Sequence, residues 1–242
     1  MASNEDDINN NCKDAKVVLI GEAGVGKTSI LKQFTLHTFD PDCASSISSQ
    51  FTSKTMNITD TKHAIRFDLW DTAGQEKYRS LAKIFYKDAS IIIFVYEITS
   101  KKSFEALQNY WYKQVTSNCI PNVLLALVGN KSDLYNRVAV EEKEAMEWAD
   151  SIGAIFQATS AKDNTGIDLL FDTLGKKFLN PDFNYKSEDN TQKKLFEQKK
   201  ESKKNKKGKK ELEDEENNNI PEVKAIKLDK KPKGKNKKKG CC

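Results

Sequence analysis

The sequence Gly21-Glu22-Ala23-Gly24-Val25-Gly26-Lys27-Thr28 gives the strongest indication of how this chain folds. It matches the pattern G-x-x-x-x-G-K-[ST] and lies between the apolar run 16–21 and a segment with helical spacing, 28–39. Glycines let such a loop wrap around phosphate groups, with backbone N–H groups at the positive end of the following helix. We expect Lys27 to reach the β- and γ-phosphates of a nucleotide and the Thr28 hydroxyl to bind Mg²⁺. Alone, the motif predicts only a nucleoside triphosphate site, and a glycine turn that caps a helix is the alternative.

Strand-like and helix-like segments alternate outward from this loop. Strands are expected at 16–21, 51–58, 64–70, 91–96, 123–129 and 154–159, and helices at 28–39, 103–115, 140–151 and 165–179. The second and third strands are separated by DTKH, which favours a hairpin. The pattern predicts an α/β fold with a six-stranded, mostly parallel sheet flanked by helices. Ligands of such sheets bind where loops leave the carboxyl ends of the strands, and the motifs of this chain fall on those loops.

Two of these loops have the chemistry to read a base. Asn130-Lys131-Ser132-Asp133 follows one expected strand, and Thr159-Ser160-Ala161-Lys162 leaves the next. A carboxylate at Asp133 can accept two hydrogen bonds from guanine, through its N1–H and exocyclic amine, whereas adenine offers no such donor pair. The second loop can offer a backbone N–H to guanine O6, and the stems of Lys131 and Lys162 can lie along the base. As an isolated tetrapeptide, NKSD would be only a polar turn.

A third loop, Asp71-Thr72-Ala73-Gly74-Gln75-Glu76, follows the expected strand 64–70. Asp71 is placed to hold Mg²⁺ through a water, and the Gly74 N–H can meet a γ-phosphate. Gln75 can orient an attacking water, although it is too weak a base to accept the proton in the ordinary sense. Positioning and charge stabilisation are the main contributions that a protein makes to phosphoryl transfer.

Charge divides the chain into unlike parts. Residues 182–242 contain 20 Lys and 12 Asp or Glu, whereas residues 1–181 contain 20 Lys or Arg and 23 Asp or Glu. Because apolar residues are scarce in 182–242, we expect a disordered basic tail. Residues 1–13 are expected to be a flexible extension, and 14–181 are long enough for one globular domain.

Membrane-spanning and secreted proteins are disfavoured. No run approaches the roughly 18 apolar residues of a membrane-spanning helix, and the first residues lack the pattern of a signal segment. The five cysteines, Cys12, Cys43, Cys119, Cys241 and Cys242, lack metal-ligand spacing and suggest reduced thiols in the cytosol. The first three are interpreted as incidental.

Residues 14–181, approximately, resemble the Ras superfamily. The resemblance rests on four motifs in this order: the phosphate loop, WDTAGQE, NKSD and TSAK. Within the superfamily, LWDTAGQEKYRSLAKIFYKDA (69–89), VYEIT (95–99) and the terminal Cys241-Cys242 resemble the Rab family. The resemblance implies a GTPase that cycles between GTP-bound and GDP-bound states and regulates vesicle traffic. The residues it assigns to the nucleotide are Gly21, Glu22, Ala23, Gly24, Val25, Gly26, Lys27, Thr28, Ser29, Phe39, Ser46, Asp71, Gly74, Asn130, Lys131, Asp133, Ser160, Ala161 and Lys162.

The resemblance also implies narrower roles. Gln75 and Lys27 are the expected catalytic residues, and Thr28, Ser46 and Asp71 the expected Mg²⁺ ligands. Phe39 falls where these proteins stack an aromatic ring on guanine. The aromatic residues Phe51, Trp70 and Phe85 match the exposed triad by which Rabs bind effectors, and plain core packing, above all for Phe85, is the alternative.

Residues 43–48, in the segment that closes over GTP in this family, depart from the family pattern. Ser46 stands where threonine is usual, Ser48 replaces a glycine, and Cys43 replaces an aromatic residue that some relatives place over the nucleotide. Serine lacks the methyl that restricts the threonine side chain, so closing this segment over GTP should cost more conformational entropy. Ala23 is less unusual, because Rabs often have serine there.

Cys241 and Cys242, after a basic tail, resemble the double prenylation site of Rabs. Two lipid chains give stable anchoring where one is marginal, and nearby lysines favour an anionic leaflet. The expected location is the cytoplasmic face of intracellular membranes. Expected partners are effectors, an exchange factor, a GTPase-activating protein, and prenylation and GDI-type escort proteins, with no nucleic acid.

Three rival interpretations follow from the same residues. A P-loop ATPase or small-molecule kinase would share the phosphate loop, but NKSD argues against it. A module that binds GTP without turnover is suggested by the departures at Ser46 and Ser48. A GTPase that binds RNA or ribosomes could use the lysine-rich tail on phosphates. The acidic ELEDEE segment and the terminal cysteines argue against that third possibility.

Overall fold

A computed structural model of the chain describes residues 11–43, 49–72, 82–118 and 123–185. The strands are β1 (Cys12–Ile20), β2 (Gln50–Asn57), β3 (Ala64–Asp71), β4 (Ile91–Glu97), β5 (Leu124–Asn130) and β6 (Ile155–Ala158). The helices are α2 (Lys27–Leu36), α3 (Ala82–Tyr86), α4 (Lys101–Ala106), the π-helix η2 (Leu107–Trp111), α5 (Tyr112–Asn118), the 3-10 helix η3 (Ser132–Arg137), α6 (Glu142–Ser151) and α7 (Ile167–Leu179). None of the described helices is long and apolar enough to cross a membrane.

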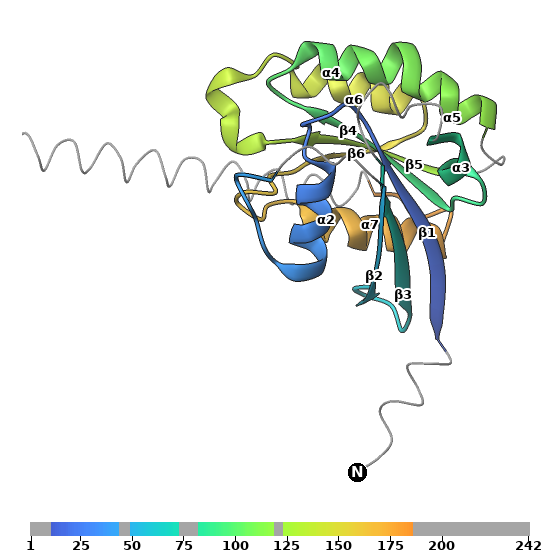
Figure 1. The fold of residues 1–242 in the computed structure, drawn as a ribbon. Helices are drawn as coiled ribbons and strands as arrows, with labels where there is room; N and C mark the ends of the chain where they lie inside the picture. Colours follow the sequence, from blue (N-terminus) through green and yellow to red (C-terminus); the bar gives the residue numbers. More distant parts are fainter. Residues whose placement is uncertain (1–10, 44–48, 73–81, 119–122, 186–242) are drawn as a thin grey trace, which may run out of the picture. The chain divides into compact units, whose positions relative to one another are not determined.

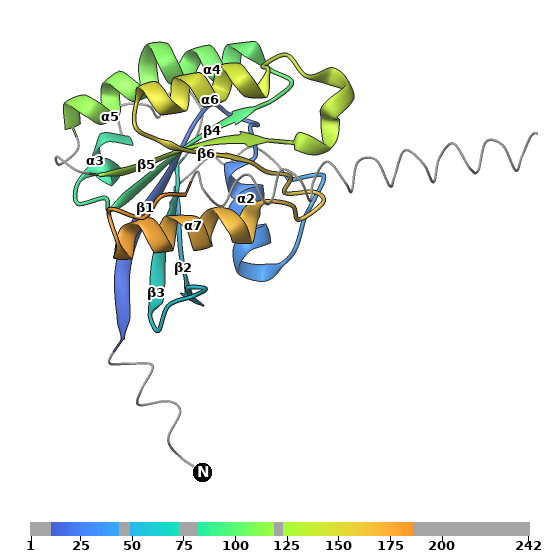
Figure 2. The same cartoon turned by 180° about the vertical axis from the view of Figure 1, so that it is seen from behind.

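The strands form one six-stranded sheet in the order β2-β3-β1-β4-β5-β6. Only the β2–β3 hairpin is antiparallel, and the other neighbouring strands are parallel. Helices cover both faces, with α2 and α7 on one side and α3 to α6 on the other (Figures 1 and 2). The predicted α/β fold with a mostly parallel six-stranded sheet is confirmed.

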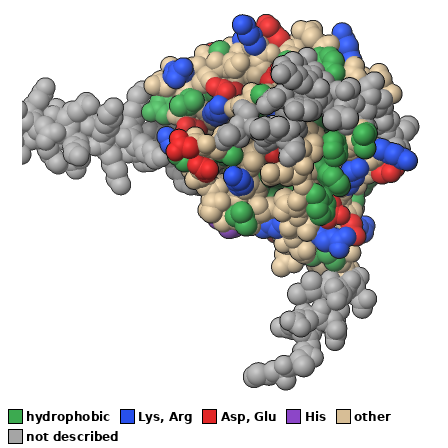
Figure 3. All heavy atoms as spheres, in the orientation of Figure 1, with side chains coloured by type: hydrophobic (Ala, Val, Ile, Leu, Met, Phe, Trp, Pro, Cys, Tyr) green, Lys and Arg blue, Asp and Glu red, His purple; other side chains and the backbone are tan. Residues whose placement is uncertain are grey.

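Each face of the sheet packs its own apolar core, because the central strands are buried on both sides. One core joins alternate residues of β1, β3 and β4 to α2 and α7, and it is centred on the stacked rings of Phe34 and Phe171. The other core joins the intervening residues to α4 to α6 and includes Trp111, which is fully buried. On the face shown in Figure 3, basic and acidic side chains are interspersed among exposed apolar ones.

The ordered structure extends beyond the expected apolar runs. β1 begins at Cys12 and pairs with β3 from Ala64 onward, so it takes up two residues of the predicted extension 1–13. At the other end, Tyr185 packs against the core and its hydroxyl donates to Ala154 O at 3.3 Å. The division of the chain at residues 13 and 181 stays a prediction.

Candidate functional site

The phosphate loop (residues 21–28) turns sharply between β1 and α2 and needs glycine at two positions. Gly26 has φ 97°, and a Cβ there would lie 2.3 Å from Asn130 Nδ2. Gly21 has φ 156°, and a Cβ there would lie 2.2 Å from Val95 O. Both approaches are too close for any side chain, so these glycines set the path of the loop.

Lys27 begins α2, and its ammonium is buried in the loop. Its Nζ donates to Gly21 O and Glu22 O, each at 2.9 Å. Burial lowers the pKa of Lys27 to about 8, against the opposing influence of the Asp71 and Glu22 carboxylates. The ammonium is thus held by carbonyls inside the loop, where its positive charge would strongly attract a bound anion.

Thr28 and Asp71 meet from two different elements. The Thr28 hydroxyl donates to Asp71 Oδ2 at 2.5 Å, which joins the start of α2 to the end of β3. Asp71 is buried, and Thr72 beside it donates from its hydroxyl to Leu19 O at 2.6 Å. A hydroxyl and a carboxylate in contact are hard oxygen donors, which is the chemistry that Mg²⁺ prefers. The described residues contain no group of three or more His, Cys, Asp or Glu that could hold a metal ion.

Asn130, at the end of β5, connects its own loop to the phosphate loop and to the loop 159–162. Its Nδ2 donates to Val25 O at 2.8 Å, and its Oδ1 accepts from Thr159 Oγ1 at 3.1 Å and Ala161 N at 3.4 Å. The residue is 1% exposed, so its polar atoms are used inside the protein. It therefore positions the loops instead of offering its own side chain to solvent.

Asp133 and Ser160, predicted to read the base, are in direct contact. Ser160 Oγ donates to Asp133 Oδ1 at 2.7 Å and accepts from Asp163 N at 3.0 Å. Asp133 lies in η3, whereas Ser160 is fully buried after β6. The hydroxyl orients one carboxylate oxygen of Asp133, while Lys162 of the same loop is exposed.

Two further polar contacts involve residues that the sequence patterns did not single out. Glu97 Oε2 lies 2.6 Å from Lys131 Nζ. Trp111 Nε1 donates to Glu22 Oε1 at 2.9 Å, from the π-helix η2 to the phosphate loop. Glu97 directly follows the expected strand 91–96, but only the pairing of β4 with β5 places it beside Asn130 and Lys131. No sequence pattern predicted that the Trp111 indole would contact Glu22, because the π-helix sets the direction in which the side chain points.

The predicted effector triad forms one aromatic cluster. The ring centroids of Phe51 and Trp70 are 5.0 Å apart, and those of Trp70 and Phe85 are 5.4 Å apart. Phe51 is 54% exposed, whereas Trp70 and Phe85 are half-buried and also pack against the core. Phe39, predicted to face the base, lies after α2 and is 38% exposed.

Some predicted site residues lie outside the described part of the chain. These are Ser46, Gly74, Gln75, Cys241 and Cys242, together with Ser48 and the basic tail. Cys43 is described, and Lys32 Nζ donates to its Sγ at 3.5 Å.

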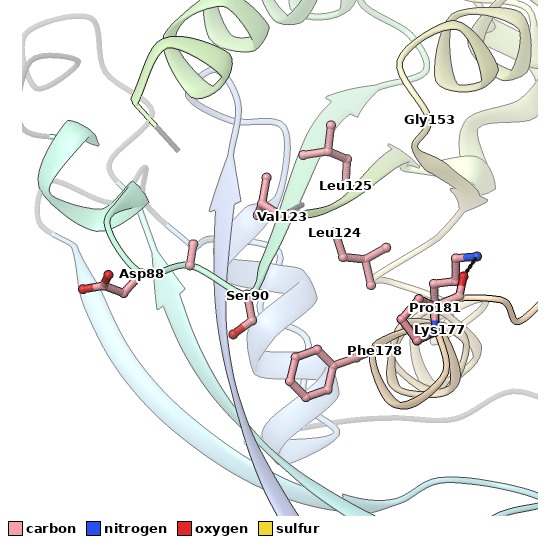
Figure 4. A pocket seen from close by; sticks show the side chains of 10 residues that line it. Asp88, Ser90, Val123, Leu124, Leu125, Gly153, Lys177, Phe178 and Pro181 are labelled. Carbon is pink, nitrogen blue, oxygen red and sulfur yellow. Dashed lines mark hydrogen bonds between the residues drawn. The ribbon is translucent and has the colours of Figure 1, made fainter. Parts of the chain in front are cut away.

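A cavity of about 550 Å³ (Figure 4) lies at the amino ends of the parallel strands, whereas the nucleotide motifs follow their carboxyl ends. It is lined by residues at the amino ends of β4, β5 and β6 and by the end of α7: Asp88, Ala89, Ser90, Val123, Leu124, Leu125, Gly153, Lys177, Phe178 and Pro181. None of the nucleotide-binding motifs contributes to this lining, so the cavity is separate from the candidate nucleotide site.

A phosphate loop at the carboxyl edge of this sheet, joined by Asn130 to two further loops, defines the class of P-loop nucleotide-binding domains. The Ras family model matches residues 16–180. The chain is 39% identical to the Ras-related protein Rab-22A of Homo sapiens over 175 residues, which are 72% of this chain and 89% of that protein. It is 40% identical to the protein of that name from Canis lupus familiaris over 172 residues, 71% of this chain and 87% of that one. The chain therefore belongs to the Ras family and is a Rab-like small GTPase, a class that hydrolyses GTP and acts in vesicle trafficking.

Proposed function

We propose that this protein is a lipid-anchored switch that reads guanine through Asp133 and signals its nucleotide state to effectors at an intracellular membrane. The observation that best supports the proposal is the network in which Asn130 joins the phosphate loop to the loop of Ser160, and Ser160 in turn orients Asp133. One buried side chain thereby couples the position of the base to the position of the phosphates.

In this proposal the phosphate loop surrounds the β- and γ-phosphates with backbone N–H groups, and Lys27 supplies the opposing charge. Thr28, Asp71 and the Ser46 hydroxyl would hold Mg²⁺, which fits the contact between the first two. When bound, Mg²⁺ neutralises charge between the phosphates. Lys27 is already held by two carbonyls, so little reorganisation is needed when phosphate arrives.

Hydrolysis would depend on the segment after Asp71. The Gly74 N–H would contact the γ-phosphate, and Gln75 would orient the attacking water. Because the sequence offers no evident arginine finger, we expect a slow unaided rate that an activating protein raises by about 10³-fold or more. Loss of the γ-phosphate contact would release this segment, which is how such a protein reports hydrolysis.

The exposed part of the Phe51–Trp70–Phe85 cluster is the proposed effector surface. Phe51, near the start of β2, pairs with Trp70, which directly precedes Asp71 at the end of β3. A change in the position of Asp71 at the γ-phosphate site would therefore also move the aromatic cluster. Cys241 and Cys242 would carry prenyl groups, delivered by prenylation and escort proteins, and the lysine-rich tail would add attraction to an anionic leaflet.

Replacing Asp133 with Asn tests the base-reading role. The amide cannot accept from both guanine donors, so we expect affinity for GDP and GTP to fall by about 100-fold or more. Xanthine has a carbonyl in place of the exocyclic amine, to which the amide N–H can donate, so xanthosine diphosphate should bind the variant relatively better. Asp163→Asn, in an exposed position of the neighbouring loop, is the matched control. Unchanged GDP affinity in Asp133→Asn would exclude this assignment.

A further inference from the structure

Glu97 lies at the junction of the two loops that follow β4 and β5. It is the last residue of β4 and pairs in register with Asn130, the last residue of β5. The backbone extends the connection, because Ile98 N donates to Asn130 O at 3.1 Å. Glu97 N in turn donates to Ser103 Oγ at 3.1 Å, which fixes the main chain around the carboxylate.

Both carboxylate oxygens of Glu97 have defined partners. Oε2 lies 2.6 Å from Lys131 Nζ, and Oε1 accepts a hydrogen bond from the Thr99 hydroxyl. The Glu97 side chain is 22% exposed and the Lys131 side chain 33% exposed, so solvent only partly screens the pair. The Lys131–Glu97 contact is therefore an oriented ion pair with limited freedom on either side.

The backbone of Lys131 is also constrained. Its φ is 64°, in the left-handed region, which non-glycine residues adopt infrequently. Ser132 N donates to Thr159 O at 3.0 Å and Leu134 N donates to Lys131 O at 2.9 Å, so the turn is fixed on both sides. With the backbone and the ammonium both held, the aliphatic stem between them has few remaining rotamers.

Glu97 stays ionised in this setting. Burial by itself would raise the pKa of its carboxyl, but hydrogen bonds from Lys131 and Thr99 and the charges of Lys131 and Arg137 outweigh it and lower the pKa. The Glu97 carboxylate therefore keeps its negative charge across the physiological pH range.

We propose that Glu97 is a positioning residue for guanine recognition, which holds the Lys131 ammonium so that the lysine stem is pre-arranged to cover the face of the base. The inference rests on the proposed function, in which Lys131 and Asp133 belong to the base site. A lysine that is already ordered loses less side-chain entropy when the nucleotide binds, so the nucleotide dissociates more slowly.

Dissociation of a fluorescent GDP analogue from the full-length protein tests this proposal. Glu97→Gln keeps the shape but removes the charge, and we expect GDP to dissociate about threefold to tenfold faster, which corresponds to ordering one long side chain. Thr99→Val removes the donor to the other oxygen and should give a smaller increase in the same direction. Glu144→Gln breaks the Lys101–Glu144 ion pair, which is outside the site, and should leave the rate unchanged.

A double-mutant cycle separates positioning from general stability. Lys131→Met should accelerate dissociation at least as much as Glu97→Gln, and adding Glu97→Gln to Lys131→Met should change nothing further. Additive effects, or an unchanged rate in Glu97→Gln, would overturn the inference. If Asp133→Asn loses guanine affinity while Glu97→Gln does not change the rate, only the role of Glu97 fails. If Asp133→Asn binds GDP normally, the proposed base site itself fails.

Discussion

At the scale of single residues, the site depends on polar groups that are buried but satisfied. Lys27 is 5% exposed and Asn130 1% exposed, and each has protein partners at hydrogen-bond distance. Such groups are costly to bury unless they are paired, so their partners fix their positions closely. Burial lowers the pKa of the Lys27 ammonium, so nucleotide binding should depend on pH.

Binding of GDP to the nucleotide-free protein should take up protons above pH 8. Burial lowers the pKa of Lys27 to about 8 in the protein alone, and a bound phosphate anion raises it again. Affinity is therefore greatest below pH 8 and should fall, by up to about tenfold per pH unit, as pH rises through and beyond this value. The phosphates themselves, with a second pKa of about 6, are already ionised there.

Calorimetry at pH 8.5 in two buffers of different ionisation enthalpy measures this uptake. The binding heats should differ between the buffers for the parent protein, and the difference should largely vanish in Lys27→Met, which also binds more weakly. Equal heats in both buffers for the parent would show that Lys27 is fully protonated before the nucleotide arrives.

How far the sequence predicts a site residue depends on whether its role is encoded locally. The phosphate loop, Asp71, Asn130 and Asp133 stand in motifs whose spacing follows from the geometry of one loop each, so their approach to one edge was predictable. Glu97 and Trp111 act across the fold, on Lys131 and on Glu22, over separations of 34 and 89 residues. Only the register of β4 against β5 and the π-turn of η2 create these contacts.

At the scale of elements, the β2–β3 hairpin is fastened to α7. Asp172, which is 7% exposed, accepts from Thr59 N at 2.8 Å and from Thr59 Oγ1 at 2.6 Å. Lys176 Nζ lies 3.4 Å from Asp172 Oδ2 and 3.3 Å from Asp60 Oδ2. The turn of the hairpin is thus bound to α7 at the edge remote from the nucleotide motifs.

Asp172→Asn should destabilise the fold without disturbing the nucleotide. The amide can satisfy Thr59 only in part and no longer balances Lys176, so we expect the free energy of unfolding to fall by about 1–3 kcal/mol. Urea denaturation at a fixed, saturating GDP concentration measures this change. Glu147→Gln breaks an exposed ion pair with Lys143 and should change stability by less than about 0.5 kcal/mol. Faster GDP dissociation in Asp172→Asn would contradict the separation of the two edges.

Element boundaries were less predictable than element order. The expected helix 103–115 is part of a longer helical segment, Lys101 to Asn118, interrupted by the π-helix η2. Periodicity marks the buried stripe of such a helix but not its capping. Ser100 accepts from Ser103 N and caps the helix three residues before the apolar pattern was expected to begin. The short helix α3 was not predicted, because five residues are too few to show a helical period.

At the scale of the whole molecule, the chain joins a mildly acidic part to a strongly basic one. Residues 182–242 have a net charge of +8, from 20 Lys and 12 Asp or Glu, whereas residues 1–181 have a net charge of −3. If the 57 residues after Tyr185 were a flexible coil, as their composition predicts, they would span about 40–45 Å. The proposed anchor at the end of the tail would therefore leave the GTPase domain free to reach partners away from the bilayer.

Replacing both Cys241 and Cys242 with Ser should release the protein from membranes to the cytosol. Lysines near an anionic leaflet each contribute about 1 kcal/mol, but this attraction is screened by salt and acts only close to the surface. Stable anchoring requires two lipid chains or one chain with a basic segment, so either single replacement should give weaker, reversible attachment. Microscopy and membrane fractionation of the tagged protein measure both effects.

The control for that experiment is Cys12→Ser, which alters a half-buried thiol in β1 and should leave membrane association unchanged. Affinity for GDP should be the same in all four variants, because the tail is far in sequence from every nucleotide motif. A double variant that stays on membranes would show that the lysines or a protein partner, and not lipid chains, hold the switch there. Loss of GDP binding in the double variant would instead mean that the two parts of the chain are coupled.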